Sequence, residues 1–306
     1  MSPYASIIIP TKNAGKQLDS VFEAIFKNFP HFSFEVIVVD SGSTDATKDI
    51  ISKYPVKLLE IPPSSFSHGG ARNLGARSAE GKILVFLTQD AVPADNWLSS
   101  LVKDFEDSNV AGVFGSQLPK KDSSPLEKFF LGYLYPDRRI IKDSINPDDC
   151  LLSEIFFSNV NSAIRKSLWQ NTRFNEKLIM SEDQEWSKDM LMKGMKIIYE
   201  PSAAVYHSHK YTFAEIIRRN FDSGMSLKGM VNAPLKRSFR CEMDYLKSGF
   251  SFFLKNKSYL SLLVFPFYET ARMLGFFLGF HNRFLPLFLK KFLSQNKAYW
   301  RAGKKA

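Results

Sequence analysis

The chain has 306 residues, of which 44% are hydrophobic and 24% charged. This composition suits one large α/β domain, alone or with an appendage, and excludes an intrinsically disordered chain. The two cysteines, Cys150 and Cys241, lack the spacing of a metal or redox motif and suit free thiols in a reducing compartment. The first residues show neither the basic start nor the long apolar segment of a secretory signal.

The net charge of +10 is concentrated toward the C-terminus. Residues 228–306 contain 15 Lys and Arg against 3 Asp and Glu, whereas residues 1–227 contain 26 basic and 28 acidic side chains. A basic end indicates contact with nucleic acid or with an anionic membrane surface. We therefore expect two parts, a nearly neutral body at 1–227 and a basic, apolar, helical region at 228–306.

Short apolar runs alternate with helical patterns in the first part of the chain, which predicts βαβ units and a parallel sheet. The run at 83–87 is continuous enough for a strand that is buried on both faces. Residues 117–149 lack such periodicity, and we expect them to form a mobile excursion over the site. The expected strands are 6–9, 35–39, 57–61, 83–87, 156–164 and 204–209, and the expected helices include 18–25, 46–54, 66–79 and one that opens near 181.

Polar residues follow the first two expected strands, at Pro10–Asn13 and Asp40–Asp45. Ligands of open α/β sheets bind beyond the carboxyl ends of the strands, and a nucleotide suits these hydroxyl, amide and carboxylate groups. Ser43 and Asp45 could equally be helix caps. The chain contains neither the glycine pattern of dinucleotide-binding proteins nor a P-loop, which makes those interpretations weak.

Asp90 lies just past the carboxyl end of the 83–87 strand, where it could contact the same ligand or simply form a turn. Arg72 follows a glycine pair at the start of a helix, where it could face a phosphate or form an ordinary salt bridge. His207 and His209 lie on one face after an apolar strand. With Asp90 they could hold a metal, although most single histidines are structural.

Three acids, Glu182, Asp183 and Glu185, precede Trp186 in the sequence. They could form an ordinary helix start after Ser181. The alternative is a general base beside an aromatic ring that stacks on a sugar.

Taken together, these motifs resemble the inverting family 2 glycosyltransferases of the glycosyltransferase-A fold, from Ser6 to about His209. The segments Phe66–Gly69, Thr88–Ala91, Ala271–Gly279 and Lys290–Ser294 resemble the rhamnosyltransferase branch. The resemblance implies an α/β fold with a Rossmann-like, mostly parallel central sheet that is flanked by helices. It rests on the motifs at Ile9–Asn13, Val38–Asp45, Ala71–Gly75, Asp90, Glu182–Asp183 and His207.

The resemblance also implies roles for individual residues. Asp183 would be the catalytic base, and Asp90, with His207, would bind Mg²⁺ or Mn²⁺ on the donor diphosphate. Thr88 stands where the family often has the first acid of its Asp-x-Asp motif. Glu182 and Trp186 would lie on the acceptor side. The residues expected to bind the nucleotide sugar are Pro10, Thr11, Asn13, Asp40, Ser41, Gly42, Arg72, Gln89 and Asp90.

The implied activity is inverting transfer of a sugar, best matched by L-rhamnose from dTDP-L-rhamnose. The acceptor would be a glycan or lipid-linked glycan in bacterial surface polysaccharide synthesis. A sugar-phosphate nucleotidyltransferase is one alternative, although Thr11–Asn13 is followed only by Ala14–Gly15 and not by a glycine-rich basic loop. A second alternative is a non-catalytic module that binds nucleotide sugars or membranes.

Residues 259–280 are mostly apolar over 22 positions, but Pro266, Glu269 and Arg272 interrupt them. We therefore expect helices that lie in an anionic membrane surface, with Leu285, Phe288, Leu289 and Phe292 as an apolar stripe among lysines. A soluble packing helix is the alternative, and no nucleic-acid-binding motif accompanies the charge. These features predict a cytoplasmic protein that is peripheral on the cytoplasmic face of the membrane.

Overall fold

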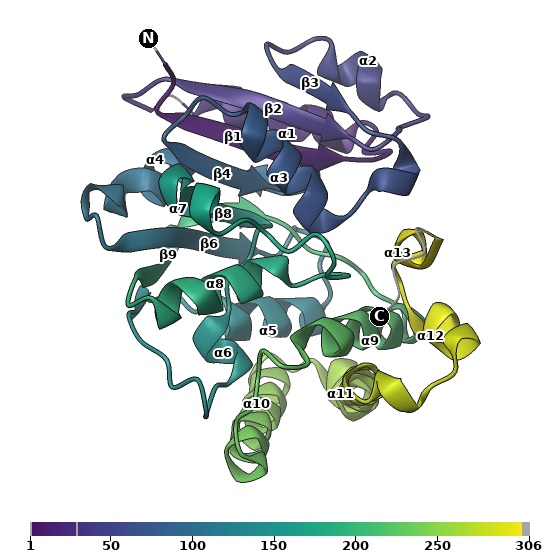
Figure 1. Cartoon of the computed structure of the whole chain (residues 1–306). Coiled ribbons are helices and arrows are strands. Elements are labelled where there is room, and N and C mark those ends of the chain that lie inside the picture. The colour runs from purple at the N-terminus through teal and green to yellow at the C-terminus, as the bar shows by residue number, and fades with distance from the viewer. Residues whose placement is uncertain (1, 29, 302–306) are drawn as a thin grey trace.

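The computed structural model describes residues 2–28 and 30–301. A nine-stranded sheet runs through the centre, helices cover both of its faces, and the two long helices near the C-terminus lie at one end (Figure 1). The strands are β1 (Ala5–Thr11), β2 (Phe34–Asp40), β3 (Lys57–Glu60), β4 (Ile83–Leu87), β5 (Val92–Pro93), β6 (Val110–Leu118), β7 (Ile140–Lys142), β8 (Asn161–Arg165) and β9 (Lys196–Tyr206). The α-helices are α1 (Gln17–Lys27), α2 (Thr47–Ile51), α3 (His68–Ser78), α4 (Trp97–Val102), α5 (Pro125–Leu134), α6 (Leu152–Ile155), α7 (Lys166–Asn171), α8 (Glu182–Met192), α9 (Phe213–Leu227), α10 (Leu235–Lys255), α11 (Tyr259–Phe280), α12 (Leu287–Leu293) and α13 (Lys297–Arg301).

The sheet has a parallel half and a mixed half. Its order is β3-β2-β1-β4-β8-β6-β9-β5, and β7 also pairs with β9. The pairs among β1 to β4 are all parallel, as the alternating pattern predicts. Beyond β4, β8 runs antiparallel to both β4 and β6, and only β6 and β9 are parallel. The antiparallel β8 brings the loop before it to the carboxyl end of β4.

Both faces of the sheet are buried, which explains the continuous apolar strand sequences. Alternate residues of β1 point to opposite sides: Ile7 and Ile9 join the core under α1, α2 and α4, whereas Ile8 joins the core that includes residues of α3, α7 and α8. The carboxyl ends of the strands are thereby held between two packed layers.

The segment at 117–149, where the sequence shows no periodicity, contains α5 and β7, while its mobility stays a prediction. Ser124 caps α5 by accepting a hydrogen bond from the Glu127 N–H, and the Glu127 side chain accepts one from the Ser124 N–H. Pro125 occupies the first helical position, which suits its fixed φ. The sequence therefore contained a helix-start signal at Ser124–Glu127 that the periodicity analysis missed.

Two later strands differ from their expected bounds. β8 begins only at Asn161, so the residues before it form a loop. β9 ends at Tyr206, so His207 and His209 lie beyond the strand rather than within it. In both cases, polar side chains that were expected within a strand lie in a loop at the carboxyl-end edge of the sheet.

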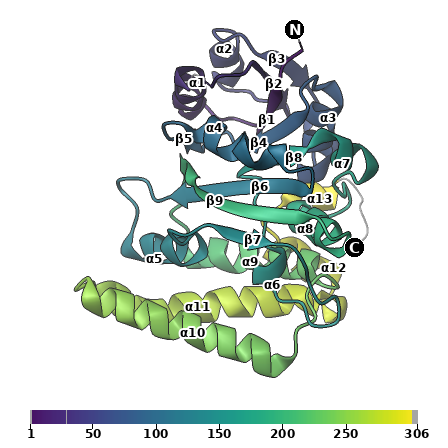
Figure 2. The ribbon, with the colours of Figure 1, turned by 90° about the vertical axis from the view of Figure 1, so that its left-hand side faces the viewer.

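The C-terminal helices pack directly against the body. Figure 2 shows α10 and α11 side by side along one end of the molecule, with α9 between them and the sheet. Three glycines bring α9 and α11 into backbone contact: a Cβ at Gly224 would lie 2.2 Å from Phe276 O, one at Gly275 2.4 Å from Ile217 O, and one at Gly279 2.0 Å from Phe221 O. The change in composition at residue 228 therefore falls where α9 ends, within a packed unit.

Candidate active site

The loops after β1, β2 and β4 converge, as the sequence analysis predicted. Thr11 Oγ1 donates a hydrogen bond to Asp40 Oδ1 (3.1 Å), and the Asn13 N–H donates to Ser43 Oγ (2.8 Å). The Gln89 side chain accepts from the Lys12 N–H (2.7 Å) and donates to the Lys12 carbonyl (3.2 Å). One edge of the sheet thus contains all of the residues that were expected to bind a nucleotide except Arg72.

Asp40 is fully buried and shapes the turn that follows β2. Its carboxylate accepts from the backbone N–H groups of Gly42 (3.0 Å) and Ser43 (2.8 Å). Gly42 has φ +81°, and a Cβ there would lie 2.8 Å from Pro63, so this turn requires glycine. Ser41 Oγ donates to the Thr11 carbonyl (2.9 Å). Contact of Asp40, Ser41 or the partly exposed Pro10 with a nucleotide remains a prediction.

Asp90, His207 and His209 form a cluster in which one ligand atom from each lies within 4.8 Å of the others. Asp90 Oδ2 is 3.2 Å from His209 Nε2, and Asp90 Oδ1 is 3.5 Å from His207 Nε2. Strand pairing creates this proximity: β5, just after Asp90, pairs with the end of β9 at Val92 and Tyr206. We call these three residues the metal triad. The resemblance had implied a ligand role for His207 but not for His209.

A second layer of contacts orients His207. Its Nδ1 donates a hydrogen bond to Gln117 Oε1 (2.8 Å), and its Nε2 faces Asp90 and lies 2.9 Å from His209 Nε2. The Gln117 amide in turn donates to Tyr135 Oη and to Ser158 Oγ (3.1 Å). Such outer contacts fix the tautomer and the ring orientation of a metal-ligating histidine. Gln117 is a functional candidate that nothing in the sequence pattern marked.

The neutral imidazole of His209 and the ionised carboxylate of Asp90 favour the binding of a cation. Burial, aided by the charge of His207, lowers the pKa of His209 to about 4, so its imidazole is neutral at pH 7. Burial alone would raise the pKa of Asp90, but the hydrogen bond and charge of His207 hold it well below its usual range. A carboxylate and two imidazole nitrogens match the ligand preferences of Mn²⁺ and similar ions better than those of Mg²⁺, which favours oxygen ligands.

Glu182 faces inward, at the first position of α8, and not toward an acceptor as expected. It forms a buried ion pair with Arg72, with the two side chains 4% and 8% exposed. Arg72 Nη2 also approaches the Asn159 carbonyl (3.5 Å). Ser181 does not cap the helix through its side chain but adopts the left-handed region with φ +66°. Arg72 therefore positions the start of α8, and its contact with a nucleotide remains a prediction.

Trp186 is also placed differently from its expected role. It is 1% exposed, and its ring lies 5.8 Å from that of Phe157 and 6.3 Å from that of Phe174. The indole is part of the core beneath α8, so it offers no open face to a sugar. Trp186 follows the buried Glu182 by one helical turn, so both lie on the inner face of the helix.

Asp183 follows Glu182 in the first turn of α8. It is partly exposed, and its two oxygens accept from the N–H groups of Asn159 and Gln184, both at 2.9 Å. Burial, followed by the charge of Glu182, raises the pKa of Asp183 to about 7. A carboxylate with this pKa can accept a proton efficiently near neutral pH.

One loop, residues 158–160, joins the two candidate groups. On one side the Asn159 N–H contacts Asp183, and on the other the Thr88 N–H, two residues before Asp90, donates to the Val160 carbonyl (3.2 Å). The Ser158 hydroxyl also contacts Gln117, the residue that orients His207. Asp90 and Asp183 therefore lie at the same end of the sheet, on either side of one short loop.

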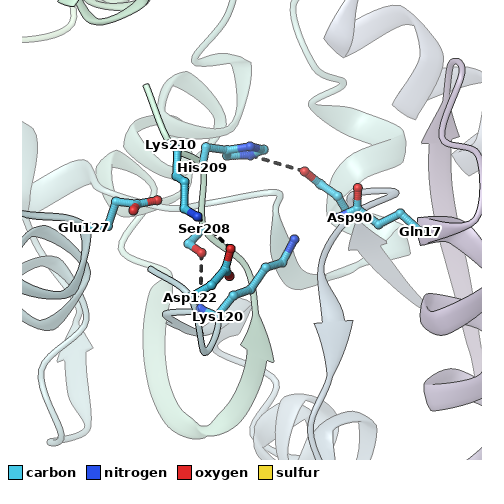
Figure 3. A pocket seen from close by; sticks show the side chains of 8 residues that line it. All are labelled: Gln17, Asp90, Lys120, Asp122, Glu127, Ser208, His209 and Lys210. Atoms are coloured by element: carbon cyan, nitrogen blue, oxygen red, sulfur yellow. Dashed lines mark hydrogen bonds and ion pairs between the residues drawn. The ribbon is translucent and has the colours of Figure 1, made fainter. Parts of the chain in front are cut away.

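A cavity of about 330 Å³ adjoins the metal triad, and Figure 3 shows Asp90 and His209 pointing toward each other at its edge. Lys120 and Lys210 bring positive charge to this cavity, and Lys210 pairs with Asp122 (2.7 Å). Much of the wall comes from the segment that was expected to be irregular. The lining residues are Gln17, Asp90, Lys120, Asp122, Glu127, Ser208, His209 and Lys210.

The mixed sheet, the polar crevice, the metal triad and the half-buried base together define a glycosyltransferase of the glycosyltransferase-A fold. The family model described as "Glycosyl transferase family 2" matches residues 6–172, more than half of the chain. The chain belongs to glycosyl transferase family 2, as its motifs indicated.

Two curated relatives extend over nearly the whole chain. The O-antigen chain rhamnosyltransferase WbaN of Salmonella anatum is 34% identical and covers 97% of this chain and 96% of its own length. RfbN of Salmonella typhimurium, also an O-antigen chain rhamnosyltransferase, is 34% identical and covers 96% and 95%. Among solved structures, the mannosyltransferase PcManGT of Pyrobaculum calidifontis, in complex with GDP-Man and Mn²⁺, has a TM-score of 0.62 at 19% identity, covering 92% of this chain and 87% of its own.

Proposed function

We propose that the protein is an inverting rhamnosyltransferase that transfers L-rhamnose from dTDP-L-rhamnose to a glycan or lipid-linked glycan of a bacterial surface polysaccharide. The observation that carries the transferase chemistry is the placement of Asp183 and the metal triad on either side of loop 158–160. The choice of sugar is supported by the two rhamnosyltransferase relatives.

Asp183 supplies the base in this reaction. Its backbone hydrogen bonds from Asn159 and Gln184 fix the carboxylate, and each oxygen keeps a lone pair that can accept the proton of the acceptor hydroxyl. The acceptor oxygen attacks the anomeric carbon from the face opposite the diphosphate, which inverts that centre in a single displacement. Arg72 neutralises Glu182 beside Asp183, so the base retains only a moderately raised pKa.

The metal triad would hold the cation, and its two histidines support Mn²⁺ over Mg²⁺. A bound divalent ion would act as a Lewis acid on the donor diphosphate and so assist its departure. Thr88, in place of a first acid, leaves the ligand set to Asp90 and the two histidines. The residues of this chain therefore fit a metal-assisted transferase.

The test is transfer from a panel of dTDP-, UDP- and GDP-sugars, with Mn²⁺ or Mg²⁺, to a lipid-linked glycan acceptor. We expect turnover with dTDP-L-rhamnose, inversion at the anomeric carbon in the product, and a preference for Mn²⁺. A retained anomeric configuration would contradict the mechanism. Turnover with a different sugar nucleotide would contradict the assignment of the donor.

We also propose that α10, α11 and α12 bind an anionic membrane surface on the cytoplasmic side. The length and apolar composition of α11 would suffice to cross a membrane. However, Glu269 and Arg272 turn inward and pair with each other and with residues of α10, which suits a helix packed on the protein on one side. Apolar side chains of α11, including Leu260 (77% exposed), Leu263 and Phe267, recur at helical spacing on its outer face.

The same pattern continues on the neighbouring helices. Leu235 and Phe239 on α10 and Phe288 and Phe292 on α12 are exposed, and lysines and arginines lie between these groups. An apolar face with a basic border is the pattern of interfacial helices, which bind anionic lipids by insertion and by charge. The exposed thiol of Cys241 on α10 is compatible with a reducing compartment.

A variant with Leu263→Asp and Phe267→Asp tests this surface by sedimentation with phosphatidylglycerol vesicles. We expect its vesicle partition to fall by about tenfold or more, because two inserted apolar groups become charged. Ile141→Asp, an exposed apolar position on β7, is the control and should bind as the wild type does. Unchanged partition of the double variant would refute the membrane surface.

A further inference from the structure

Arg219 lies on the second turn of α9. Within the described part of the chain, its positively charged guanidinium forms no ion pair with an acidic side chain. Tyr211 holds it instead: Arg219 Nη1 donates to Tyr211 Oη (2.5 Å), and the guanidinium carbon lies 5.3 Å from the centre of the same ring. The side chain is exposed, so its charge is accessible from solvent.

The same tyrosine links Arg219 to the metal triad. The ring of Tyr211 lies 5.4 Å from that of His209, whose Nε2 is 3.2 Å from Asp90. The start of α9 is fixed directly after Tyr211, because Thr212 and Glu215 cap the helix reciprocally. The guanidinium is thus held two side chains away from Asp90 by a rigid helix start.

Arg219 lies beside the metal triad, because Tyr211 contacts both the guanidinium and the ring of His209.

We propose that Arg219 binds the diphosphate of the donor and stabilises the charge that develops on it during transfer, an inference that rests on the proposed function. The bond from the anomeric carbon to the diphosphate oxygen breaks, and its electron pair stays on that oxygen. The acceptor oxygen bonds to the anomeric carbon, and its proton goes to Asp183. A planar guanidinium can donate two hydrogen bonds to such an anion and is matched to phosphate geometry.

Arg218 provides a matched control on the same helix. Its guanidinium lies 5.5 Å from the ring centre of Phe292 on α12 and therefore packs toward the C-terminal helices. Substitution of Arg218 removes the same charge from the same turn without removing the Tyr211 contact.

The experiment uses the full chain with Mn²⁺ and compares Arg219→Gln, Arg219→Lys and Arg218→Gln with the wild type. Calorimetry measures binding of dTDP, UDP and GDP and of the matching monophosphates, and steady-state kinetics separates kcat from KM. For Arg219→Gln we expect about tenfold weaker binding of the preferred diphosphate, monophosphate affinity within twofold, and kcat lowered by about 10²-fold. Arg219→Lys should recover part of the loss, and Arg218→Gln should match the wild type.

Wild-type kcat and diphosphate affinity in Arg219→Gln would overturn the proposal, as would an equal loss for monophosphates and diphosphates. Absence of diphosphate binding by the wild type would also overturn it. If Arg219→Gln does not fold, Arg219→Lys provides the test. Because lysine lacks the planar guanidinium with its paired N–H donors, this variant must still bind diphosphates more weakly than the wild type while its monophosphate affinity is unchanged. If the wild type binds a diphosphate but transfers no sugar, the proposed function fails while the binding comparison still tests Arg219.

Discussion

The catalytic body and the helical C-terminal region each contain an Arg–Glu pair with a buried glutamate, and the two pairs differ in what lies beside them. In the body, Arg72 pairs with Glu182 at the start of α8. In the helical region, Arg272 pairs with Glu269 and also contacts Glu242 on α10. Both pairs contain a glutamate that is almost inaccessible to solvent.

The two pairs differ in whether a second, solvent-accessible carboxylate lies beside the buried glutamate. Glu269 is sealed by Arg272 and by Tyr245 Oη, which donates to it at 2.9 Å, and its pKa is raised chiefly by burial. Beside Glu182, by contrast, Asp183 is partly exposed, and its carboxylate accepts hydrogen bonds from the backbone N–H groups of Asn159 and Gln184. A buried ion pair is therefore weak support for an active site on its own. An open carboxylate whose pKa such a pair adjusts is stronger support.

The largest expected effect separates these two acids. Asp183→Asn should lower kcat by roughly 10²–10⁴-fold, the usual contribution of a general base, while donor affinity is retained. Glu269→Gln should leave kcat within about twofold of the wild type and lower the melting temperature instead. Steady-state kinetics, donor calorimetry and thermal unfolding measure these quantities. Substantial turnover by Asp183→Asn would show that Asp183 is not the general base and that the two acids do not differ in function.

The next effect concerns the metal side of the cleft. Gln117→Leu should weaken Mn²⁺ binding by about 10–100-fold, because His207 loses the partner that fixes its ring. Calorimetric titration with Mn²⁺ measures the change, and circular dichroism checks the fold. Wild-type metal affinity in this variant would show that His207 needs no such support.

The pH dependence sharpens the role of the Arg72–Glu182 pair. Asp183 must be ionised to accept a proton, so activity should fall as the pH drops through about 7. Glu182→Gln removes the negative charge that helps to raise this pKa and should move the acid limb of the kcat profile to lower pH. An acid limb that stays in place would show that Glu182 does not tune the base.

Ionisation of Asp183 should affect folding stability in the opposite direction to activity: a rise in pH increases activity but lowers the stability of the folded protein. Because the folded protein raises the pKa of Asp183, ionisation of this group costs folding free energy, and the cost appears as the pH rises above the unfolded pKa of about 4. Asp183→Asn should therefore unfold at a higher temperature than the wild type at pH 8 and show a smaller difference at pH 5.

The smallest effects concern two glycines. Gly279→Ala should destabilise the protein by about 1–3 kcal/mol, because the new Cβ would lie 2.0 Å from Phe221 O in the α9–α11 contact. A Cβ added at Gly132, in α5, would meet no atom within 4 Å, so Gly132→Ala should stabilise the protein by about 0.5–1 kcal/mol. Denaturant unfolding of both variants measures these changes. Equal stability of the two would contradict the close helix contact.

Much of the fold followed from local patterns. The strands of the parallel half were predicted within a few residues because each is a buried apolar run bounded by polar turns, as at Ile83–Leu87. The mixed half was harder. Strand β8 is shorter than the apolar pattern, and the direction in which it pairs is decided by tertiary contacts that the sequence does not show.

The candidate site was predicted in part for similar reasons. Asp90, His207 and Asp183 follow recognisable segments, and the structure brings them to one end of the sheet. Glu182 and Trp186 were misinterpreted because residues next to each other on a helix point in different directions, and only packing decides which faces the cleft. Gln117 contacts partners far away in the sequence, such as Ser158 and His207, and the Tyr211–Arg219 contact belongs to no recognised motif, so the sequence marked neither residue.

The glycine contact between α9 and α11 has a practical consequence for versions of this protein that are shortened to improve solubility. A chain cut after Leu227 would leave Gly224 and its neighbours as an open groove on the helix that carries Arg219. The exposed backbone and apolar surface would favour aggregation. The C-terminal helices should therefore be kept when this enzyme is produced.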